Sequence, residues 1–147
     1  MRVYYGVASG RDGRGVALEL YMVGLVVRDM RASVEFYRQL GLAIPDASEE
    51  QKFVEIKMTG MSLFLDATAS VWDPSYVTSH EALVAAEAGK HGHLLEFNLL
   101  ERQAVDAMYD KLMRLGYRSH RAPYEVTSEA YFALVFDPDG NMVLFSA

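Results

Sequence analysis

The chain contains no cysteine among its 147 residues. Disulfide bonds and thiolate metal sites are therefore excluded, and nothing in the composition favours an oxidising compartment. The sequence also lacks an apolar run approaching the ~18 residues of a membrane-spanning helix. Its N-terminal stretch has no continuous apolar segment of the kind that signal peptides carry. These absences predict a cytoplasmic protein without a membrane partner.

Basic residues are in the minority, with 14 Lys and Arg against 20 Asp and Glu and a formal net charge of -6. Proteins that bind nucleic acids need clustered Lys and Arg to neutralise phosphates. The charge balance therefore predicts no nucleic-acid partner, and it is compatible with a cationic ligand. A chain of this length forms about one domain with one hydrophobic core.

A strand, a helix and a hairpin follow one another in the first half of the sequence. The apolar run "LYMVGLVV" has the length of a strand, and a helical pattern follows that Asp29 can cap and Gly41 can end. Residues 52–58 and 61–67 alternate around a turn at Thr59 and Gly60, which predicts a hairpin.

The same order recurs in the second half. "HLLEFNLL" predicts a strand, "ERQAVDAMYDKLMRLGY" a helix that Gly116 ends, and "YFALVFDPDGNMVLFSA" a hairpin with Pro and Gly in its turn. The two hairpins correspond residue by residue, with Gly60 matching Gly140 and Phe64 matching Leu144. We therefore infer an internal duplication.

The duplication defines the organisation of the chain. It predicts one α+β domain over residues 20–147, made of module one (20–67), a linker (68–92) and module two (93–147). Residues 1–19 form an N-terminal extension, in which two apolar stretches around a glycine-rich turn predict a hairpin. A rival interpretation treats the extension as an accessory that folding and assembly do not need.

"GLVVRDMRASVEFYRQLGL", followed much later by "FALVFDPDGNMVLF", resembles the vicinal oxygen chelate superfamily. This superfamily includes glyoxalase I, extradiol dioxygenases, fosfomycin-resistance enzymes and bleomycin-resistance proteins. The resemblance implies two βαβββ modules whose strands form a cup-shaped mixed sheet, usually completed in a homodimer. A strand that the pattern of module two does not show directly is expected near "RSHRAPYEV".

Metal-dependent members of the superfamily carry His, Glu or Gln at four positions. Matched by distance from the RD and DPDG motifs, these positions are Met22, Phe64, His93 and Leu144. Only His93 offers a donor suited to a hard divalent cation, which needs three or four such ligands. His91, two residues away in "HGHLLEF", does not complete a site. We therefore expect no metal and no other cofactor, with His93 a neutral histidine on the cup floor.

Strand alternation predicts which side chains line the cup. The expected cup face is mainly apolar and carries Met22, Gly24, Ser62, Phe64, Asp66, His93, Leu95, Met142, Leu144 and Ser146. Such a lining suits an organic ligand, and the alternative is a cup filled as core. The same alternation places Glu96 and Asn98 on the helix-covered face, where a carboxylate is costly unless a bulge or a dimer contact intervenes.

Aromatic side chains in expected loops add to this pocket. Trp72, Tyr76 and Tyr124 are placed to stack on a planar ligand or to hold a cation, or else to anchor their loops. The predicted ligand-binding set is Met22, Phe64, Asp66, Trp72, Tyr76, His93, Leu95, Tyr124 and Leu144.

The sequence thus predicts a metal-independent binding protein similar to the bleomycin-resistance type. It would sequester a small aromatic or cationic molecule in the cleft of a homodimer. One alternative is a metal-dependent lyase, isomerase or dioxygenase that uses His93 with Glu55 or Asp66. Another is a structural or regulatory dimer with a filled cup and no ligand.

Overall fold

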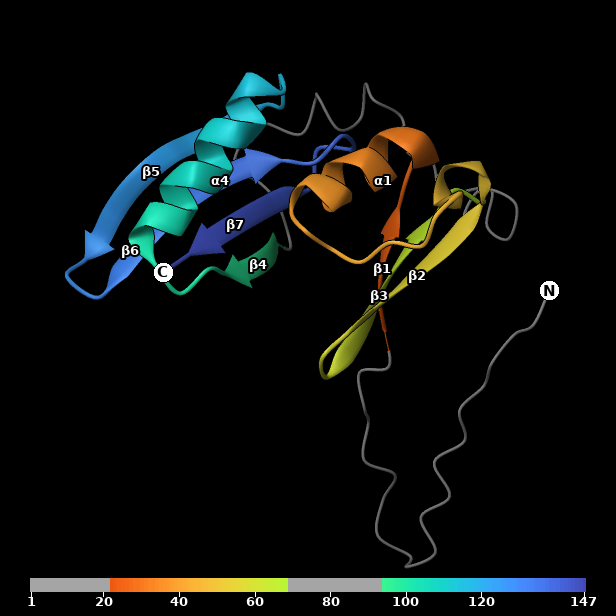
Figure 1. Cartoon of the computed structure of the whole chain (residues 1–147), viewed down its shortest axis with the longest axis horizontal. Helices are drawn as coiled ribbons and strands as arrows, with labels where there is room; N and C mark the ends of the chain where they lie inside the picture. The colour runs from red at the N-terminus through yellow and green to blue at the C-terminus, as the bar shows by residue number, and fades with distance from the viewer. Residues whose placement is uncertain (1–21, 69–93) are drawn as a thin grey trace, which may run out of the picture.

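The computed structural model describes residues 22–68 and 94–147, which form two sheets and two helices (Figure 1). Module one contains β1 (Met22–Val26), α1 (Met30–Gln39), a 3-10 helix (Ser48–Glu50), β2 (Phe53–Met58) and β3 (Met61–Asp66). Module two contains β4 (Leu94–Asn98), α4 (Arg102–Arg114), β5 (Ser119–Thr127), β6 (Ala130–Phe136) and β7 (Met142–Ser146). The predicted helices and hairpins are confirmed. Some of the sequence predictions concern residues outside the described ranges. These are the expected N-terminal hairpin, Trp72, Tyr76 and both histidines of "HGH".

The two sheets share one topology, as the duplication predicts. In the first sheet the order is β1-β3-β2, and in the second it is β4-β7-β6-β5. The first strand of each module pairs in parallel with the last, and the hairpins pair antiparallel. Strand β5 covers the segment where a further strand was expected. Within its described residues, module one has a 3-10 turn near Pro45 instead of an equivalent strand.

Local sequence signals set the ends of both helices. The side chain of Asp29 accepts a hydrogen bond from the amide of Ala32 (3.2 Å) and so caps α1. Gly41 and Gly116 follow the helices with φ of 94° and 86°, a left-handed conformation that a residue without Cβ adopts at little cost.

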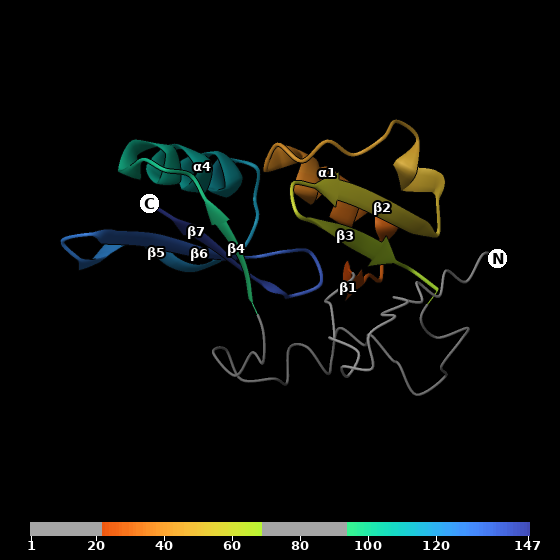
Figure 2. The ribbon, with the colours of Figure 1, turned by 90° about the horizontal axis from the view of Figure 1, so that it is seen from below.

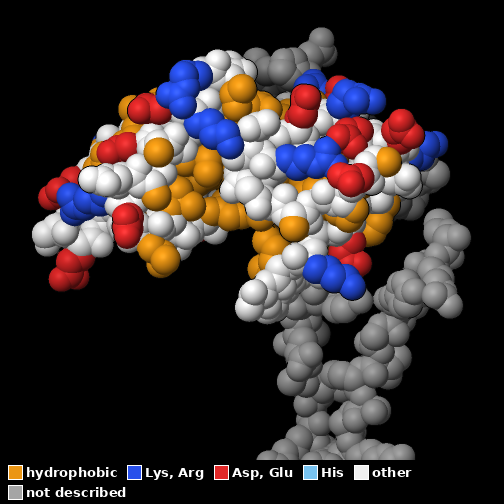
Figure 3. Space-filling view, viewed as in Figure 1, with side chains coloured by type: hydrophobic (Ala, Val, Ile, Leu, Met, Phe, Trp, Pro, Cys, Tyr) orange, Lys and Arg blue, Asp and Glu red, His pale blue; other side chains and the backbone are white. Residues whose placement is uncertain are grey.

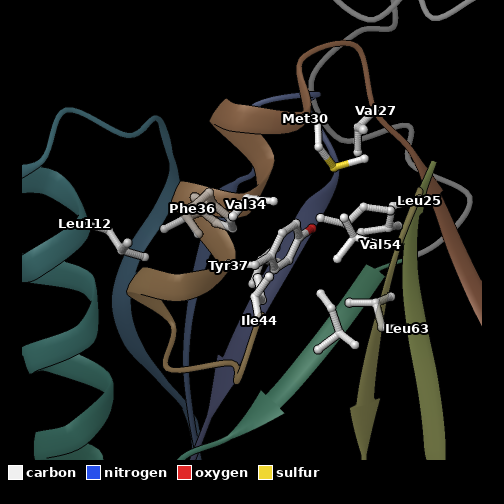
Figure 4. Close-up of a cluster of buried hydrophobic side chains, with 14 of the residues drawn as sticks. Leu25, Val27, Met30, Val34, Phe36, Tyr37, Ile44, Val54, Leu63 and Leu112 are labelled. Atoms are coloured by element: carbon white, nitrogen blue, oxygen red, sulfur yellow. The ribbon is translucent and has the colours of Figure 1, made fainter. Parts of the chain in front are cut away.

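Both helices cover the same side of the two sheets, and one core lies beneath them (Figure 2). Residues of α1, among them Val34 and Phe36, belong to the same buried cluster as Leu112 of α4 (Figure 4). The rings of Phe36 and Tyr117 meet edge to face at 5.0 Å, which joins the helix of module one to the segment after α4. We call the opposite, helix-free face of the sheets the cup face.

A buried polar cluster also joins the modules. The hydroxyl of Tyr37 donates to Asp137 (2.7 Å), and the hydroxyl of Ser33 donates to Asp139 (3.0 Å). Asp139 also accepts the amide of Arg28 (2.9 Å). Both carboxylates are 4% exposed, so these bonds replace the water that burial removes. The DPDG turn of module two is thereby bound to the start of α1.

Candidate ligand-binding cleft and cup face

A cleft of about 560 Å³ lies between β1, β4 and the tip of the β2–β3 hairpin. Its volume falls within the range of small-molecule sites. Among the described residues the lining is apolar apart from one carboxylate, and it consists of Val23, Gly24, Leu25, Met58, Met61, Leu63, Leu94, Leu95, Glu96 and Phe97. Figure 3 shows hydrophobic side chains on the lower side of the molecule, around the hollow between the modules.

Glu96 is the charged group of this cleft, and its position corrects the sequence prediction. It is exposed on the cup face, in register with Leu144, and accepts a hydrogen bond from the hydroxyl of Ser146 (2.7 Å). Asn98 is exposed on the same face, whereas Leu95 and Phe97 pack against the core. The expected orientation of β4 was therefore wrong by one residue, so no bulge is needed to explain Glu96. Leu95 contributes to the cleft from the helix side.

The strand register also changes one of the four superfamily positions. Met22 pairs with Ser62, and Leu94 pairs with Met142. Ser62 and Met142 each stand two residues after the turn glycine of their hairpin, so Leu94 is the equivalent of Met22. The count from sequence motifs assigned this position to His93, which lies outside the described residues. Leu95, Phe97 and Leu99 alternate with the polar residues Glu96 and Asn98, and this alternation was the sequence signal that the odd-numbered side chains of β4 face the core.

Phe64 occupies the centre of the cup face in module one. Its ring lies against Gly24, where a Cβ atom would stand only 2.0 Å from Cζ of the ring. Phe53, which is 48% exposed, stacks on Phe64 with ring centroids 5.2 Å apart. Glycine at position 24 thus allows an aromatic pair to lie flat beside the cleft.

The donors at the superfamily positions do not fit a divalent cation. Met22, Phe64, Leu94 and Leu144 offer a thioether and hydrocarbon groups, which cannot replace imidazole or carboxylate ligands. No three His, Cys, Asp or Glu side chains group together within residues 22–68 and 94–147.

The two acids considered as alternative ligands have other contacts. Glu55 is exposed and accepts a hydrogen bond from the hydroxyl of Ser62 (2.9 Å). Asp66 is buried at the end of β3, where one carboxylate oxygen accepts both the amide and the hydroxyl of Thr68 at 2.6 Å. The described contacts therefore give Asp66 a role in ending the strand.

The cup face of module two is aromatic along β5 and β6. Tyr124 lies in β5 rather than in a loop, opposite Phe132, with which it makes an edge-to-face contact at 6.3 Å. Arg121 lies over the Tyr124 ring at 3.4 Å, and Arg118 lies over Phe136 at 4.1 Å. Sequence reasoning missed both arginines, although their place in the strand segment "RSHRAPYEV" was a usable signal.

Comparisons with known proteins agree with this fold. The Glyoxalase/Bleomycin resistance protein/Dioxygenase superfamily matches residues 19–145. The chain therefore belongs to this superfamily, as the sequence resemblance indicated. A search of curated proteins gave no significant match.

Three solved structures show how widely the fold is shared. A superfamily enzyme from Burkholderia phytofirmans is 22% identical, with a TM-score of 0.66 and coverage of 88% of this chain and 98% of that one. A glyoxalase-related enzyme from Fulvimarina pelagi is 18% identical (TM-score 0.68, 88% of both chains). The fosfomycin resistance protein FosX from Listeria monocytogenes is 12% identical (TM-score 0.62, 90% and 94%). Neither described helix is long and apolar enough to cross a membrane.

Proposed function

We propose that the protein binds and sequesters a small organic molecule with a planar apolar body, without using a metal. The observation that carries the proposal is the cleft of about 560 Å³ between β1 and β4, which combines apolar walls with one carboxylate, Glu96. Apolar walls with few polar groups are typical of sites that hold an organic ligand by contact. The aromatic pair of Phe53 and Phe64 extends this surface beside Gly24.

The chemistry of the cleft supports binding over catalysis. General acid–base catalysis needs groups positioned to give and take a proton at the reacting atom. Glu96 is the only titratable side chain among the described lining residues, and its described partner is a serine hydroxyl. A lone carboxylate suits the recognition of a cationic group or a hydrogen-bond donor on the ligand. Cationic aromatic molecules therefore remain favoured ligands for this cleft.

A homodimer is part of the proposal, because members of the superfamily commonly form dimers. The similarity to a structure named as a fosfomycin resistance protein is consistent with a harmful small molecule as the ligand, and the sequestering role rests on the cleft. Light scattering of the full chain on a sizing column would measure the assembly, and a monomeric mass would refute the dimeric form of the proposal.

Metal content is the first test. Elemental analysis of full-length protein purified without chelator is expected to show less than stoichiometric metal, and Zn, Mn, Ni and Fe(II) are expected to leave the melting temperature unchanged. Stoichiometric metal, or stabilisation that a His93→Ala variant loses, would instead support the metal-dependent lyase, isomerase or dioxygenase.

Binding in the cleft is the second test, with 2-naphthalenemethanol as a neutral planar probe. Leu94→Trp places a large ring at the cleft, at a position that is 48% exposed and so accepts the larger side chain. The matched control is Leu115→Trp, at a position that is 52% exposed beyond α4 and outside the cleft lining. We expect Leu94→Trp to weaken probe binding at least about tenfold and the control to leave it unchanged. Equal effects of the two variants, or no binding to the wild type, would refute the proposed site.

A further inference from the structure

We infer that the cup face of module two holds a second, anionic subsite, in which Arg121 binds a carboxylate or phosphate group of the ligand and Arg118, farther along the sheet, adds positive charge. The inference deepens the proposed function and rests on it for the ligand body. It adds a charged end-group to the planar molecule and assigns residues to recognise that group. No residue of this subsite lines the cleft between β1 and β4.

Both arginines lie on the cup face. In an antiparallel pair, residues directly opposite each other point to the same face, and Arg121 pairs with Leu134 while Tyr124 pairs with Phe132. The neighbours Ala133 and Val135 are fully buried on the helix side. The even-numbered residues of β6 therefore face the cup, together with the side chains opposite them in β5.

Each guanidinium lies over an aromatic ring. The Cζ atom of Arg121 is 3.4 Å from the ring centroid of Tyr124, and that of Arg118 is 4.1 Å from the centroid of Phe136. The ring of His120 meets Phe136 edge to face at 5.4 Å. An arginine placed over a ring keeps its N–H edge available, and this edge matches the two oxygens of a carboxylate or phosphate.

A third arginine, Arg102, also lies over an aromatic ring but, unlike Arg118 and Arg121, has acceptors among the described residues. This ring is that of Tyr131, at 5.3 Å. There the guanidinium is satisfied, because it donates to the carboxylate of Glu125 at 2.8 Å and to the carbonyl of Ser128 at 2.9 Å. Among the described residues, neither Arg118 nor Arg121 has a carboxylate within ion-pair distance. Two exposed cations, one on β5 and one directly before it, are thus left for an external anion.

The sheet order defines what the ligand must span. The strands run β4-β7-β6-β5, with Glu96 on one edge strand and the arginines on or beside the other. Three strand spacings separate these edges, about 14 Å in all. Leu134 and Phe132 are half-buried on the cup face of β6, whereas Leu144, which pairs with Leu134, is only 7% exposed. A planar body against Leu134 and Phe132 would place an acidic end at Arg121.

The test compares matched naphthalene probes on the full-length protein by titration calorimetry. 2-Naphthoate and 2-naphthyl phosphate carry the anion, and 2-naphthalenemethanol is the neutral match. The wild type is expected to bind at least one anionic probe at least about tenfold more tightly than the alcohol, as a charge-assisted bond implies. Which of the two anions binds more tightly identifies the end-group. Added salt is expected to weaken the binding of the anionic probes and not that of the alcohol.

Arg118→Gln and Arg121→Gln remove each charge and keep much of the side chain. Arg121→Gln is expected to remove most of the preference for the anion and Arg118→Gln a smaller part of it, and both are expected to leave alcohol binding unchanged. Arg114→Gln, at an exposed position in the last turn of α4, makes the same change in net charge and is expected to have no effect. Melting curves of all variants check that each one folds.

The outcomes separate the two proposals. Equal affinity for acid and alcohol in the wild type, or an equal loss in Arg114→Gln, would overturn the anionic subsite while the cleft stands. If the anionic probes bind and lose affinity in Arg121→Gln, but Leu94→Trp does not weaken binding of the alcohol, the subsite is supported and the proposed cleft is refuted. Absence of binding by every probe would overturn both.

Discussion

The hydroxyl of Tyr37, in the helix of module one, donates a 2.7 Å hydrogen bond to the carboxylate of Asp137, in the hairpin turn of module two. Tyr37 is fully buried, and Asp137 also accepts the amides of Asp139 and Asn141 and the side-chain amide of Asn141. The DPDG motif therefore has a structural task beyond its turn, because its acids bond to side chains of the other module that lie 100 and 106 residues away in sequence.

Tyr37→Phe is expected to destabilise the fold. The substitution removes a buried hydrogen bond to a charged group, whose contribution is about 1.5–3 kcal/mol. Urea unfolding of the two proteins measures this difference. Tyr131→Phe is the matched control, since Tyr131 donates a 2.7 Å hydrogen bond to Asp106 within one module and is only half-buried. A loss in Tyr131→Phe as large as that in Tyr37→Phe would contradict the importance of the inter-module bond.

Titration of Tyr37 predicts a loss of stability in alkali. Burial raises the pKa of Tyr37 well above its usual value of 10.0, and the charge of Asp137 raises it further. Above pH 10 the unfolded chain releases the proton while the folded chain keeps it, so the free energy of unfolding falls as pH rises. Unfolding measured from pH 8 to pH 11 is expected to show this fall in the wild type and a shallower one in Tyr37→Phe. Parallel profiles would show that Tyr37 does not cause the fall.

Replacing Asp139 by a neutral residue is expected to affect the stability of the fold differently from the same change at Asp137. Burial is the main cause that raises the pKa of Asp139, and the Asp137 charge adds to it. The raised pKa means that ionising Asp139 opposes folding, so its contribution to stability is present below pH 3.8 and is lost as pH rises through the folded pKa. An asparagine can still accept the amide of Arg28 and can donate to Ser33.

We therefore expect Asp139→Asn to be at least as stable as the wild type at pH 7, with a weaker dependence on pH between 3 and 6. Asp137→Asn should be less stable. Every described partner of Asp137 donates a hydrogen bond to it, so the NH2 group of an asparagine, itself a donor, would face one of these donors. Urea unfolding of both variants across this pH range makes the comparison. Stability of Asp139→Asn well below that of Asp137→Asn would show that the charge of Asp139 is needed.

The sequence predicted the helices and hairpins because their signals are local. Asp29 and the glycines after each helix mark helix ends, and alternation marks the strands of the hairpins. It did not predict the bond between Tyr37 and Asp137, because neither residue carries a local sign of its partner. It also placed β4 in the wrong frame. A shift of one residue turns every side chain of a strand to the other face, so Glu96 was placed toward the core and Leu95 in the cup.

Gly24→Ala is expected to disturb the cup without unfolding the protein. The new methyl group would overlap the end of the Phe64 ring, which must move away and break its stack on Phe53. Overpacking of this kind costs about 1–3 kcal/mol. Combining the change with Phe64→Leu, which shortens the ring side chain, should recover much of that loss in a double-mutant cycle. Additive effects of the two substitutions would show that the ring does not occupy this space.

Glu96→Gln tests what the carboxylate of the cleft recognises. Glu96 is exposed, so its carboxylate is accessible to a ligand while it accepts the hydrogen bond from the hydroxyl of Ser146. We expect the variant to lose affinity for 2-naphthylmethylammonium by about tenfold and to bind 2-naphthalenemethanol unchanged. Asp110→Asn, at an exposed position on α4 and outside the described cleft lining, removes the same charge and controls for the change in net charge. If both variants lose the same affinity for the ammonium probe, the net charge of the protein and not Glu96 attracts the cation.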